Sequence, residues 1–493
     1  MCHPPHPVMD RISTGISMHS GKAIRTPDVR FLYSVSIQEK RNGQTGGPFL
    51  RSGGTPGRRP IRPTTAPEEK VDFAPLHFLT APAGGCTEFH LHRRRRGPFG
   101  REFARRGTGS MIDFNPCMKH KVVRKTVREF AEAELAPLVH DLDREARFPW
   151  EVVEKMRSLH FFGLQVPREY GGAEVDGVSY AIVIEELSRV SAAVGLAVTV
   201  HNSVGANPIA RFGTEAQKRR FLPALAGGER IGAFCLTEAN AGSDAAGVET
   251  HAVAEGDGYV LNGTKIFVTN GGVCGTALVF AVTDPEKKKN NAGVFVVEKE
   301  TPGFSVGEIE DLCGMRANPV SSLFFEDCRV PAGNLLGRPG DGLKIGLAAL
   351  DTGRIGVAAQ ALGIAQAALD ASIRYAKERQ QFRRPIASFQ TIQNYLADMS
   401  TEIDAGRLLI YRACAMKDAG KPYTAEAAKA KLYCSRLAVR VADMAVQIHG
   451  GYGYSKEYDV ERYFRDAKVT EIYEGTSEVQ RMVISRTLLA QPR

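Results

Sequence analysis

The chain has 493 residues, of which 43% are hydrophobic and 24% charged, a composition that predicts a soluble protein with two or three folded domains. Its formal net charge is +9, but residues 1–110 hold 18 Lys and Arg against 8 Asp and Glu, and the remainder holds 46 against 47. The body of the chain therefore lacks the basic signature of nucleic-acid binding, and no apolar run reaches the ~18 residues of a membrane span.

Residues 1–110 differ from the rest of the chain because they are rich in Pro, Gly, Arg and Ser and show no sustained periodicity. This composition predicts a disordered basic extension. Met111 opens "MIDFNPCMKHKVV", which resembles a natural start, so we favour an extended or misassigned N-terminus. Two alternatives remain, an organelle-targeting leader and nucleic-acid binding through "HRRRRG" (92–97). We expect a cytoplasmic location, or the mitochondrial matrix if the leader is genuine.

Residues 111–230 are predicted to form an N-terminal helical domain. "VVRKTVREFAEAELAPLVHDLD" places Val123, Val127, Phe130, Leu135 and Leu138 near one face, with charges opposite. The helical pattern continues to about residue 229.

Residues 231–336 are predicted to form a central β domain, because short β-branched runs alternate there with turn residues. Asn262-Gly263, between two such runs, predicts a hairpin turn. The same stretch, "GYVLNGTK", has the glycine spacing of a P-loop, but its Thr and Lys are in the wrong order.

Residues 337–493 are predicted to be helical again. Residues 343–380 are compatible with one long helix, and further helices are expected around 390–419, 424–448 and 477–489. "SEVQ" (477–480) is a capping-box pattern that places a helix start near Ser477. The order helical, β, helical is not an alternating βαβ plan and indicates an α+β multidomain protein.

The nine cysteines are odd in number and contain no CxxC pair, which predicts reduced thiols rather than a disulfide framework. No Cys/His spacing fits a zinc site. We therefore expect no metal.

Four motifs carry the chemistry: "AFCLTEANAGSDAAG" (233–247), "KIFVTNG" (265–271), "ERQQFRRPIASFQ…" with "QIHGGYGYS" (378–399 and 447–455), and "EIYEGTSEVQRMV" (471–483). Arg379 offers a planar cationic fork suited to a pyrophosphate, with a solvated helix charge as the less favoured alternative. Gly450 and Gly451 allow close backbone approach to a dinucleotide.

Together and in this order, the motifs resemble the acyl-CoA dehydrogenase family from Met111 to Leu489. The resemblance implies an N-terminal helical domain, a β-barrel-like central domain, a C-terminal four-helix bundle and FAD as cofactor. It assigns FAD contacts to Phe234, Leu236, Thr237, Ser243, Phe267, Thr269, Arg379, Gln390, Gln447, Gly450, Gly451, Thr476 and Glu478. Two positions depart from the family: Ala239 replaces Pro, and Phe267 replaces Trp. Taken alone, Phe267 is equally compatible with a core residue.

The resemblance also implies that Glu474 is the catalytic base, which removes the α-proton of an acyl thioester while the β-hydrogen leaves as hydride to flavin N5. Glu471 and Glu478 are interpreted as surface acids. Substrate contacts are expected from Ser243, Asp351, Arg354 and Gly475. Some family members carry the base immediately before an Arg on the long helix. Here Gly353 precedes Arg354, which leaves Glu474 in the role.

The hypothesis is therefore an FAD-dependent dehydrogenase of short, possibly branched or cyclic, acyl-CoA thioesters. The resemblance implies that it passes electrons to an electron-transfer flavoprotein and works as a homo-oligomer, a dimer of dimers in which some FAD contacts come from the neighbouring subunit. The alternatives are an acyl-CoA oxidase that uses O2 and, in another class, a non-catalytic scaffold or nucleic-acid-binding protein that uses the basic arm.

Overall fold

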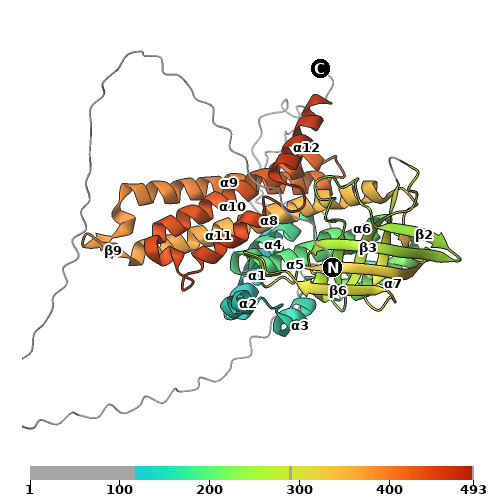
Figure 1. Cartoon of the computed structure of the whole chain (residues 1–493). Helices are drawn as coiled ribbons and strands as arrows, with labels where there is room; N and C mark the ends of the chain where they lie inside the picture. The colour runs from blue at the N-terminus through green and yellow to red at the C-terminus, as the bar shows by residue number, and fades with distance from the viewer. Residues whose placement is uncertain (1–116, 288–290, 491–493) are drawn as a thin grey trace, which may run out of the picture. The chain divides into compact units, whose positions relative to one another are not determined.

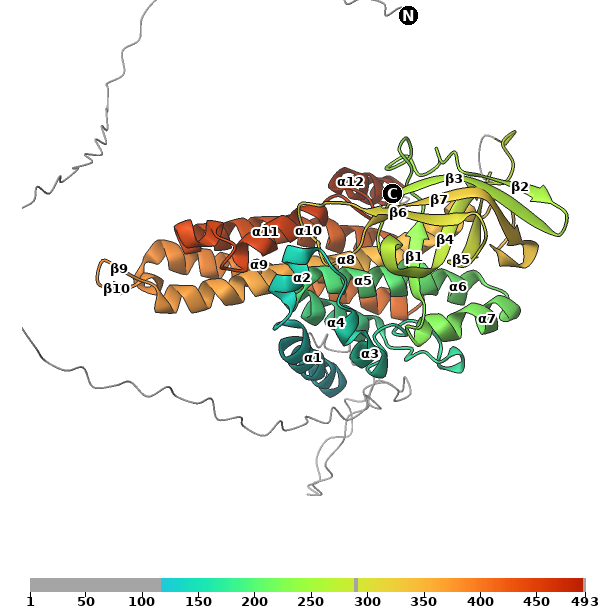
Figure 2. The same ribbon diagram turned by 60° about the horizontal axis from the view of Figure 1, so that its bottom comes forward.

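The computed structural model describes residues 117–287 and 291–490, so the expectations about residues 1–110 lie outside the described residues (Figures 1 and 2). Its first part is helical. The helices are α1 (Met118–Phe130), α2 (Val139–Glu145), α3 (Trp150–Ser158), α4 (Gly177–Val190), α5 (Ala192–Val200), α6 (Asn207–Phe212) and α7 (Glu215–Ala226), with π-helical turns at Ala131–Leu135 and His201–Ala206.

The apolar stripe predicted for the first helix is buried at Val123, Val127, Phe130 and Leu135, whereas Leu138 is half-buried. α4 and α5 are buried on nearly all sides, because they lie between α1 and the C-terminal helices.

The second part is a mainly antiparallel sheet. Its strands are β1 (Ile231–Cys235), β2 (His251–Glu255), β3 (Gly258–Val268), β4 (Cys274–Val282), β5 (Ala292–Glu298), β6 (Phe304–Ile309), β7 (Ser321–Pro331) and β8 (Leu335–Leu336). The strand order is β6-β7-β3-β2-β4-β5-β8, and β1 pairs in parallel with β4.

The hairpin predicted at Asn262-Gly263 is wrong. Both residues lie inside β3, and the turn between β2 and β3 lies at residues 256–257. Gly256 has a φ of +61°, the left-handed conformation that such a turn needs. Gly263 instead accompanies a register shift against β7, and a Cβ there would meet Thr250 Oγ1 at 2.5 Å. This glycine therefore serves a bulge and a close approach.

The third part is a helical bundle. It contains α8 (Gly342–Glu378), β9 (Gln380–Gln381), β10 (Arg384–Pro385), α9 (Gln390–Asp418), α10 (Thr424–His449), α11 (Val460–Val469) and α12 (Ser477–Leu489). α8 is one helix of 37 residues, as its pattern indicated, and it contacts α4, α5, α9, α10 and α11. α11 was not predicted; it is only ten residues long, and its five apolar residues alternate with charged ones.

The cap of α12 also differs from the prediction. The helix begins at Ser477, but Thr476 is the N-cap, and its hydroxyl accepts a hydrogen bond from the Val479 amide. The capping-box pattern therefore placed the N-cap one residue too late. Thr476 and Ser477 are adjacent, and both residue types are good N-caps.

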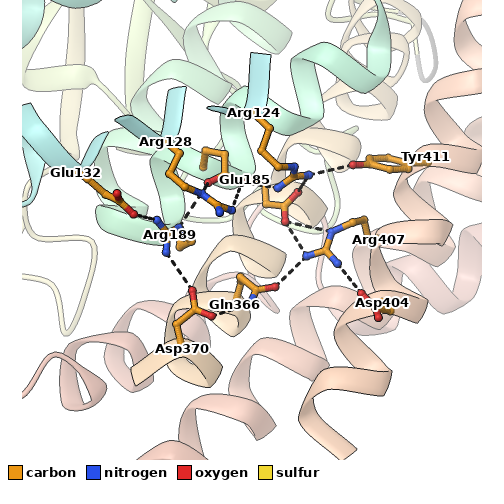
Figure 3. A network of polar contacts seen from close by, with 11 residues as sticks. Arg124, Arg128, Glu132, Glu185, Arg189, Gln366, Asp370, Asp404, Arg407 and Tyr411 are labelled. Atoms are coloured by element: carbon orange, nitrogen blue, oxygen red, sulfur yellow. Dashed lines mark hydrogen bonds and ion pairs between the residues drawn. The ribbon is translucent and has the colours of Figure 1, made fainter. Parts of the chain in front are cut away.

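A buried network of charges joins α1, α4, α8 and α9 (Figure 3). Glu185 and Glu186 of α4 are its acidic centre, with side chains only 3% and 1% exposed. Arg124 of α1 bonds both carboxylates, and Arg407 of α9 donates to Glu185 over 2.8 Å. The network therefore ties the N-terminal helices to the bundle.

Within the described ranges, no helix is long and apolar enough to cross a membrane. The same residues contain no cluster of three or more metal-ligating side chains. Their seven cysteines are free thiols, of which five are buried and Cys313 is exposed.

Candidate active site

A cavity of about 180 Å³ lies where the helical parts meet the sheet. Its lining comes from all three parts of the chain. The lining residues are Val200, Val204, Phe234, Leu236, Thr237, Gly242, Ser243, Ala245, Phe267, Thr269, Leu347, Leu350, Arg354, Tyr473, Glu474, Gly475 and Val479. The wall is largely apolar, and Arg354 and Glu474 are its basic and acidic side chains.

Glu474 lies on the loop that joins α11 to α12, and its backbone is in the left-handed region with a φ of +51°. Both carboxylate oxygens are shielded from solvent and have no hydrogen-bond partner among the described residues. Burial raises the pKa of Glu474 to about 7, although the positive charges of Lys431 and Arg354 oppose the shift. A carboxyl group in this state can accept a proton near neutral pH.

Gly353 makes room for that carboxylate on the surface of α8. A Cβ added to Gly353 would lie 1.9 Å from Glu474 Oε2, which is far inside van der Waals contact. The position before Arg354 is therefore already filled by an acid, but the acid comes from a loop some 120 residues further along the chain. A side chain at residue 353 and a carboxylate at residue 474 exclude one another sterically.

Two neighbours of Glu474, Arg354 and Tyr473, are held by polar contacts to α8. Arg354 donates to Asp351 Oδ1 over 2.6 Å, and the hydroxyl of Thr424 donates to Asp351 Oδ2 over 2.5 Å. Asp351 is not part of the cavity lining, so its expected substrate contact stays a prediction. Tyr473 donates to Gln360 over 2.6 Å, which fixes the residue before Glu474.

The opposite wall carries the residues of the first two motifs. Phe267 is 58% exposed, so it is not a core residue of this chain, and its φ of +52° accompanies a register shift at the end of β3. The Ile266 amide donates to the Thr237 carbonyl over 3.0 Å, which joins this strand to the loop after β1. Phe234, Leu236, Ser243 and Thr269 line the same cavity.

A buried ion pair, which the sequence analysis missed, fixes that wall. Lys265 is fully buried, and its ammonium group bonds Glu238 over 2.6 Å. Glu238 also accepts from the amides of Glu249 and Thr250. The pair therefore fastens the loop after β1 onto β3. Nothing in the local pattern of either residue distinguished them from surface charges.

A second cavity of about 610 Å³ lies at the other end of α8 and includes Arg379, Gly450 and Gly451. The Arg379 guanidinium lies 5.4 Å from the centre of the Tyr452 ring, and no carboxylate pairs with it among the residues described. His449 stacks on Tyr375 with ring centres 4.2 Å apart. From Arg354 to Tyr375, α8 rises roughly 30 Å, so the two cavities of one chain are well separated.

The remaining predicted residues lie outside both linings. Gln390 and Gln447 are exposed near the second cavity, at the start of α9 and the end of α10. Thr476 caps α12, and Glu478 is exposed and paired with Arg481. Glu471, interpreted as a surface acid, is partly covered and bonds Lys468. Each of these positions stays a prediction.

A third cavity, of about 730 Å³, lies between α2, α11 and residues 311–316. Its charges are mostly paired with one another: Arg465 bonds Asp143 and Glu461, and Arg316 bonds Asp311. No shielded, unpartnered acid lines it within the described part of the chain. The smaller cavity around Glu474 is therefore the candidate active site.

Comparison with known proteins agrees with this geometry. The models of the acyl-CoA dehydrogenase N-terminal, middle and C-terminal domains match residues 118–229, 233–328 and 340–489. The chain therefore belongs to the acyl-CoA dehydrogenase family, FAD-dependent oxidoreductases that act on CH–CH bonds.

Its relatives include short-chain enzymes. The chain is 49% identical over 374 residues to the short-chain-specific acyl-CoA dehydrogenase of Clostridium acetobutylicum, which covers 76% of this chain and 99% of that protein. It resembles the structure of Megasphaera elsdenii butyryl-CoA dehydrogenase with a TM-score of 0.75 and 46% identity, covering 77% and 100% of the two chains. A chain from structural work on the electron transferring flavoprotein of Acidaminococcus fermentans matches with a TM-score of 0.76 and 47% identity, again over 77% and 100%.

FAD is the cofactor of this family, and the residues present fit it. The exposed apolar ring of Phe267 and the hydroxyl of Thr269 line one wall of the cavity, opposite the shielded acid. In the second cavity, Arg379 offers a planar cation that bonds no carboxylate of the described residues, and added Cβ atoms at Gly450 and Gly451 would meet only open space. An apolar slot and a cationic, glycine-lined cavity suit a flavin ring and a pyrophosphate respectively.

Proposed function

We propose that the chain removes two hydrogens from a short-chain acyl-CoA to give the 2-enoyl-CoA, with Glu474 as the base. The observation that supports the proposal is the Glu474 carboxylate, which is shielded, has no hydrogen-bond partner among the described residues and has a pKa of about 7. A base with a pKa near the working pH is the most effective proton acceptor, whereas a solvated glutamate is too weak.

The reaction requires two hydrogens to leave adjacent carbons. Glu474 takes the α-proton, and the electron pair of that C–H bond forms the new double bond as the β-hydrogen leaves with its electrons. FAD, when bound, supplies the acceptor for that hydride. The apolar lining, including Val200, Val204 and Leu350, excludes water from the carboxylate and keeps it basic.

The preference for short acyl groups rests on the relatives of the chain. The relatives at 46–49% identity include enzymes named as short-chain-specific or butyryl-CoA dehydrogenases. We infer a substrate in the butyryl range, with its thioester near Glu474 and Ser243 toward the CoA side.

We also propose an oligomer that completes each FAD site. The cavity with Glu474 and the cavity with Arg379 lie at opposite ends of α8, and Figures 1 and 2 show β9 at the end of the bundle remote from the sheet. In such an oligomer, the Arg379 cavity of a neighbouring subunit would lie beside the Glu474 cavity of the first subunit, so that the two cavities together hold one FAD. The electron acceptor we propose is an electron-transfer flavoprotein, which the Acidaminococcus match favours.

Anaerobic titration of the FAD-loaded protein with acyl-CoAs of increasing length tests the proposal, with bleaching of the flavin absorbance as the readout. We expect butyryl-CoA to bleach it and Glu474→Gln to slow bleaching by about 10³- to 10⁴-fold, while binding persists. Glu471→Gln is the matched control, because this acid pairs with Lys468 and lies outside the cavity lining. Bleaching by Glu474→Gln at the wild-type rate would refute the assignment. Rapid reoxidation in air without the flavoprotein partner would favour an oxidase.

A further inference from the structure

Lys431 of α10 is buried close to the Glu474 loop, and no motif drew attention to it. Its side chain is fully buried, and its ammonium group donates to the Gly475 carbonyl over 2.8 Å. No carboxylate lies within ion-pair distance of it among the residues described. An ammonium group is costly to bury, and an apolar side chain would fill the same space, so packing does not explain the charge.

The carbonyl that Lys431 holds belongs to a strained turn. Glu474 and Gly475 are consecutive residues with positive φ, +51° and +94°. A left-handed conformation costs roughly 1 kcal/mol or more at a residue with a side chain, so surrounding contacts must hold Glu474 in it. The turn is also what directs the carboxylate against Gly353 of α8.

Three side chains hold the backbone of this turn. Lys431 bonds the carbonyl of Gly475, and Ser435, one helical turn further along α10, donates to the carbonyl of Thr470 over 2.8 Å. The amide of Gln480 donates to the carbonyls of Glu474 and Gly475, over 3.2 and 2.8 Å. One face of α10 therefore contacts both ends of the loop, and Lys431 is the charged member of that face.

We propose that Lys431 is a positioning residue for the reaction: its ammonium group holds the Gly475 carbonyl and thereby keeps Glu474 in the conformation that turns its carboxylate toward Gly353 and the cavity. This inference rests on the proposed function of Glu474. Lys431 does not line the cavity, so it acts through the loop rather than on the substrate.

The electrostatics agree with this geometry. Burial lowers the pKa of Lys431 to about 8, while the charge of Glu474 opposes the shift. The other charged groups around Lys431 are Arg354 of α8, Glu471 of the loop and Glu478 of α12. The positive charges of Lys431 and Arg354 both favour the ionised form of Glu474. Loss of the Lys431 charge would therefore raise the pKa of Glu474.

The test compares Lys431→Met with the FAD-loaded wild type by two measurements. Hydrogen–deuterium exchange of the amides in residues 473–480 reports the loop without any turnover. Steady-state oxidation of butyryl-CoA reports the reaction. We expect faster exchange in this segment and a fall in kcat of about 10- to 100-fold, because a misplaced base loses its reactive geometry, with KM nearly unchanged. Wild-type exchange and wild-type kcat in Lys431→Met would overturn the proposal.

Lys429→Met is the matched control, because Lys429 lies on the same helix but is partly exposed and pairs with Glu426. It should match the wild type in both measurements. Lys431→Gln keeps a hydrogen-bond donor but removes the positive charge, so it separates the two contributions. It also tests the proposal if Lys431→Met does not fold. The side-chain amide of the new glutamine can still donate to the Gly475 carbonyl, so we expect the backbone amides of residues 473–480 to stay protected from exchange. Because the positive charge is lost, we expect the acid limb of the kcat–pH profile to move to higher pH. Faster exchange together with an unmoved limb would contradict the proposal.

The two measurements also separate this proposal from the proposed function. A wild type that fails to oxidise any acyl-CoA would refute the function, whereas the exchange data would still show whether Lys431 holds the loop.

Discussion

The protein buries carboxylates in two regions, and their pKa values are shifted in opposite directions. Glu185 and Glu186 lie among Arg124, Arg128, Arg189 and Arg407, and together they form many ion pairs (Figure 3). Burial alone would raise the pKa of Glu185, but Arg407 and Arg124 outweigh it and leave the pKa below the usual value. At Glu474 burial prevails, and the pKa rises to about 7.

The two regions differ in how far nearby arginines compensate the buried charge. Glu185 accepts hydrogen bonds from two arginines, so its charge is compensated in the folded state. Glu474 is approached by two positive charges but accepts no hydrogen bond from the described residues, which leaves its oxygens available for the proton transfer that we propose. Solvent exposure alone would not distinguish Glu185 from Glu474, because the carboxylate oxygens of both residues are shielded.

The largest effect should come from breaking the compensated region. Glu185→Gln leaves Arg124 and Arg407 with one fewer buried counter-charge, and we expect a loss of about 3–5 kcal/mol in the free energy of unfolding. Glu474→Gln removes an uncompensated acid, so at pH 8 we expect unchanged or increased stability. Urea denaturation of both variants measures the contrast.

Glu129→Gln is the control for these variants, because Glu129 lies on α1 and is 57% exposed. Its stability should be within about 0.5 kcal/mol of the wild type. Equal destabilisation by Glu185→Gln and Glu474→Gln would contradict the distinction between the two regions.

A smaller effect should follow from crowding the free carboxylate. In Gly353→Ala the new Cβ would stand 1.9 Å from Glu474 Oε2, so the acid must move. We expect kcat for butyryl-CoA to fall by about 10- to 100-fold with the fold retained. Gly333→Ala is the control, since its Cβ would meet open space. A fully active Gly353→Ala would show that the loop can shift without harm.

The smallest effect concerns the pH dependence of stability. The folded pKa of Glu474 lies above its unfolded value of about 4.5, so its contribution to stability is present at low pH and is lost as the pH rises toward 7. For Glu185 the folded pKa is lowered, so its contribution is present above pH ~4.5 and is lost in acid. The stability of Glu474→Gln relative to wild type should therefore increase between pH 5 and 8, by no more than ~1.4 kcal/mol per pH unit.

Glu185→Gln should show the opposite trend, with its deficit shrinking below about pH 4. Thermal unfolding of the wild type, Glu474→Gln and Glu185→Gln, measured from below pH ~4 up to pH 8, gives the slope of stability against pH for each protein. Parallel curves for all three would mean that neither carboxylate has a shifted pKa.

Local patterns predicted much of the fold. The stripe through Val123 and Val127, the strand runs and the 37-residue α8 are readable because apolar spacing reports which face is buried. The hairpin at Asn262-Gly263 was wrong because the same dipeptide also suits a bulge, and only the pairing of β3 with β7 distinguishes them. α11 was missed because it is short and its apolar residues are interspersed with charged ones.

The site was predicted less completely than the fold. The motif around Glu474 is visible in the sequence, as are Arg354 and Phe267. Lys431 has a weak signal, because it shares the helical face of Ala427, Ala428, Cys434 and Ser435, all of which are buried. A lysine on such a face is unusual. Lys265 and Glu238 have no comparable signal, because their pairing joins β3 to the loop after β1, 27 residues away in the sequence.

Spacing along the chain was enough to predict the order of helical and β segments, the family and the motif that bears the proposed base. The shielding of the Glu474 carboxylate, its position against Gly353 and the approach of Lys431 and Arg354 became visible only in the folded structure. A pKa depends on solvent exclusion and on charges nearby in space, and α8, α10 and the loop before α12 come together only when the chain is folded.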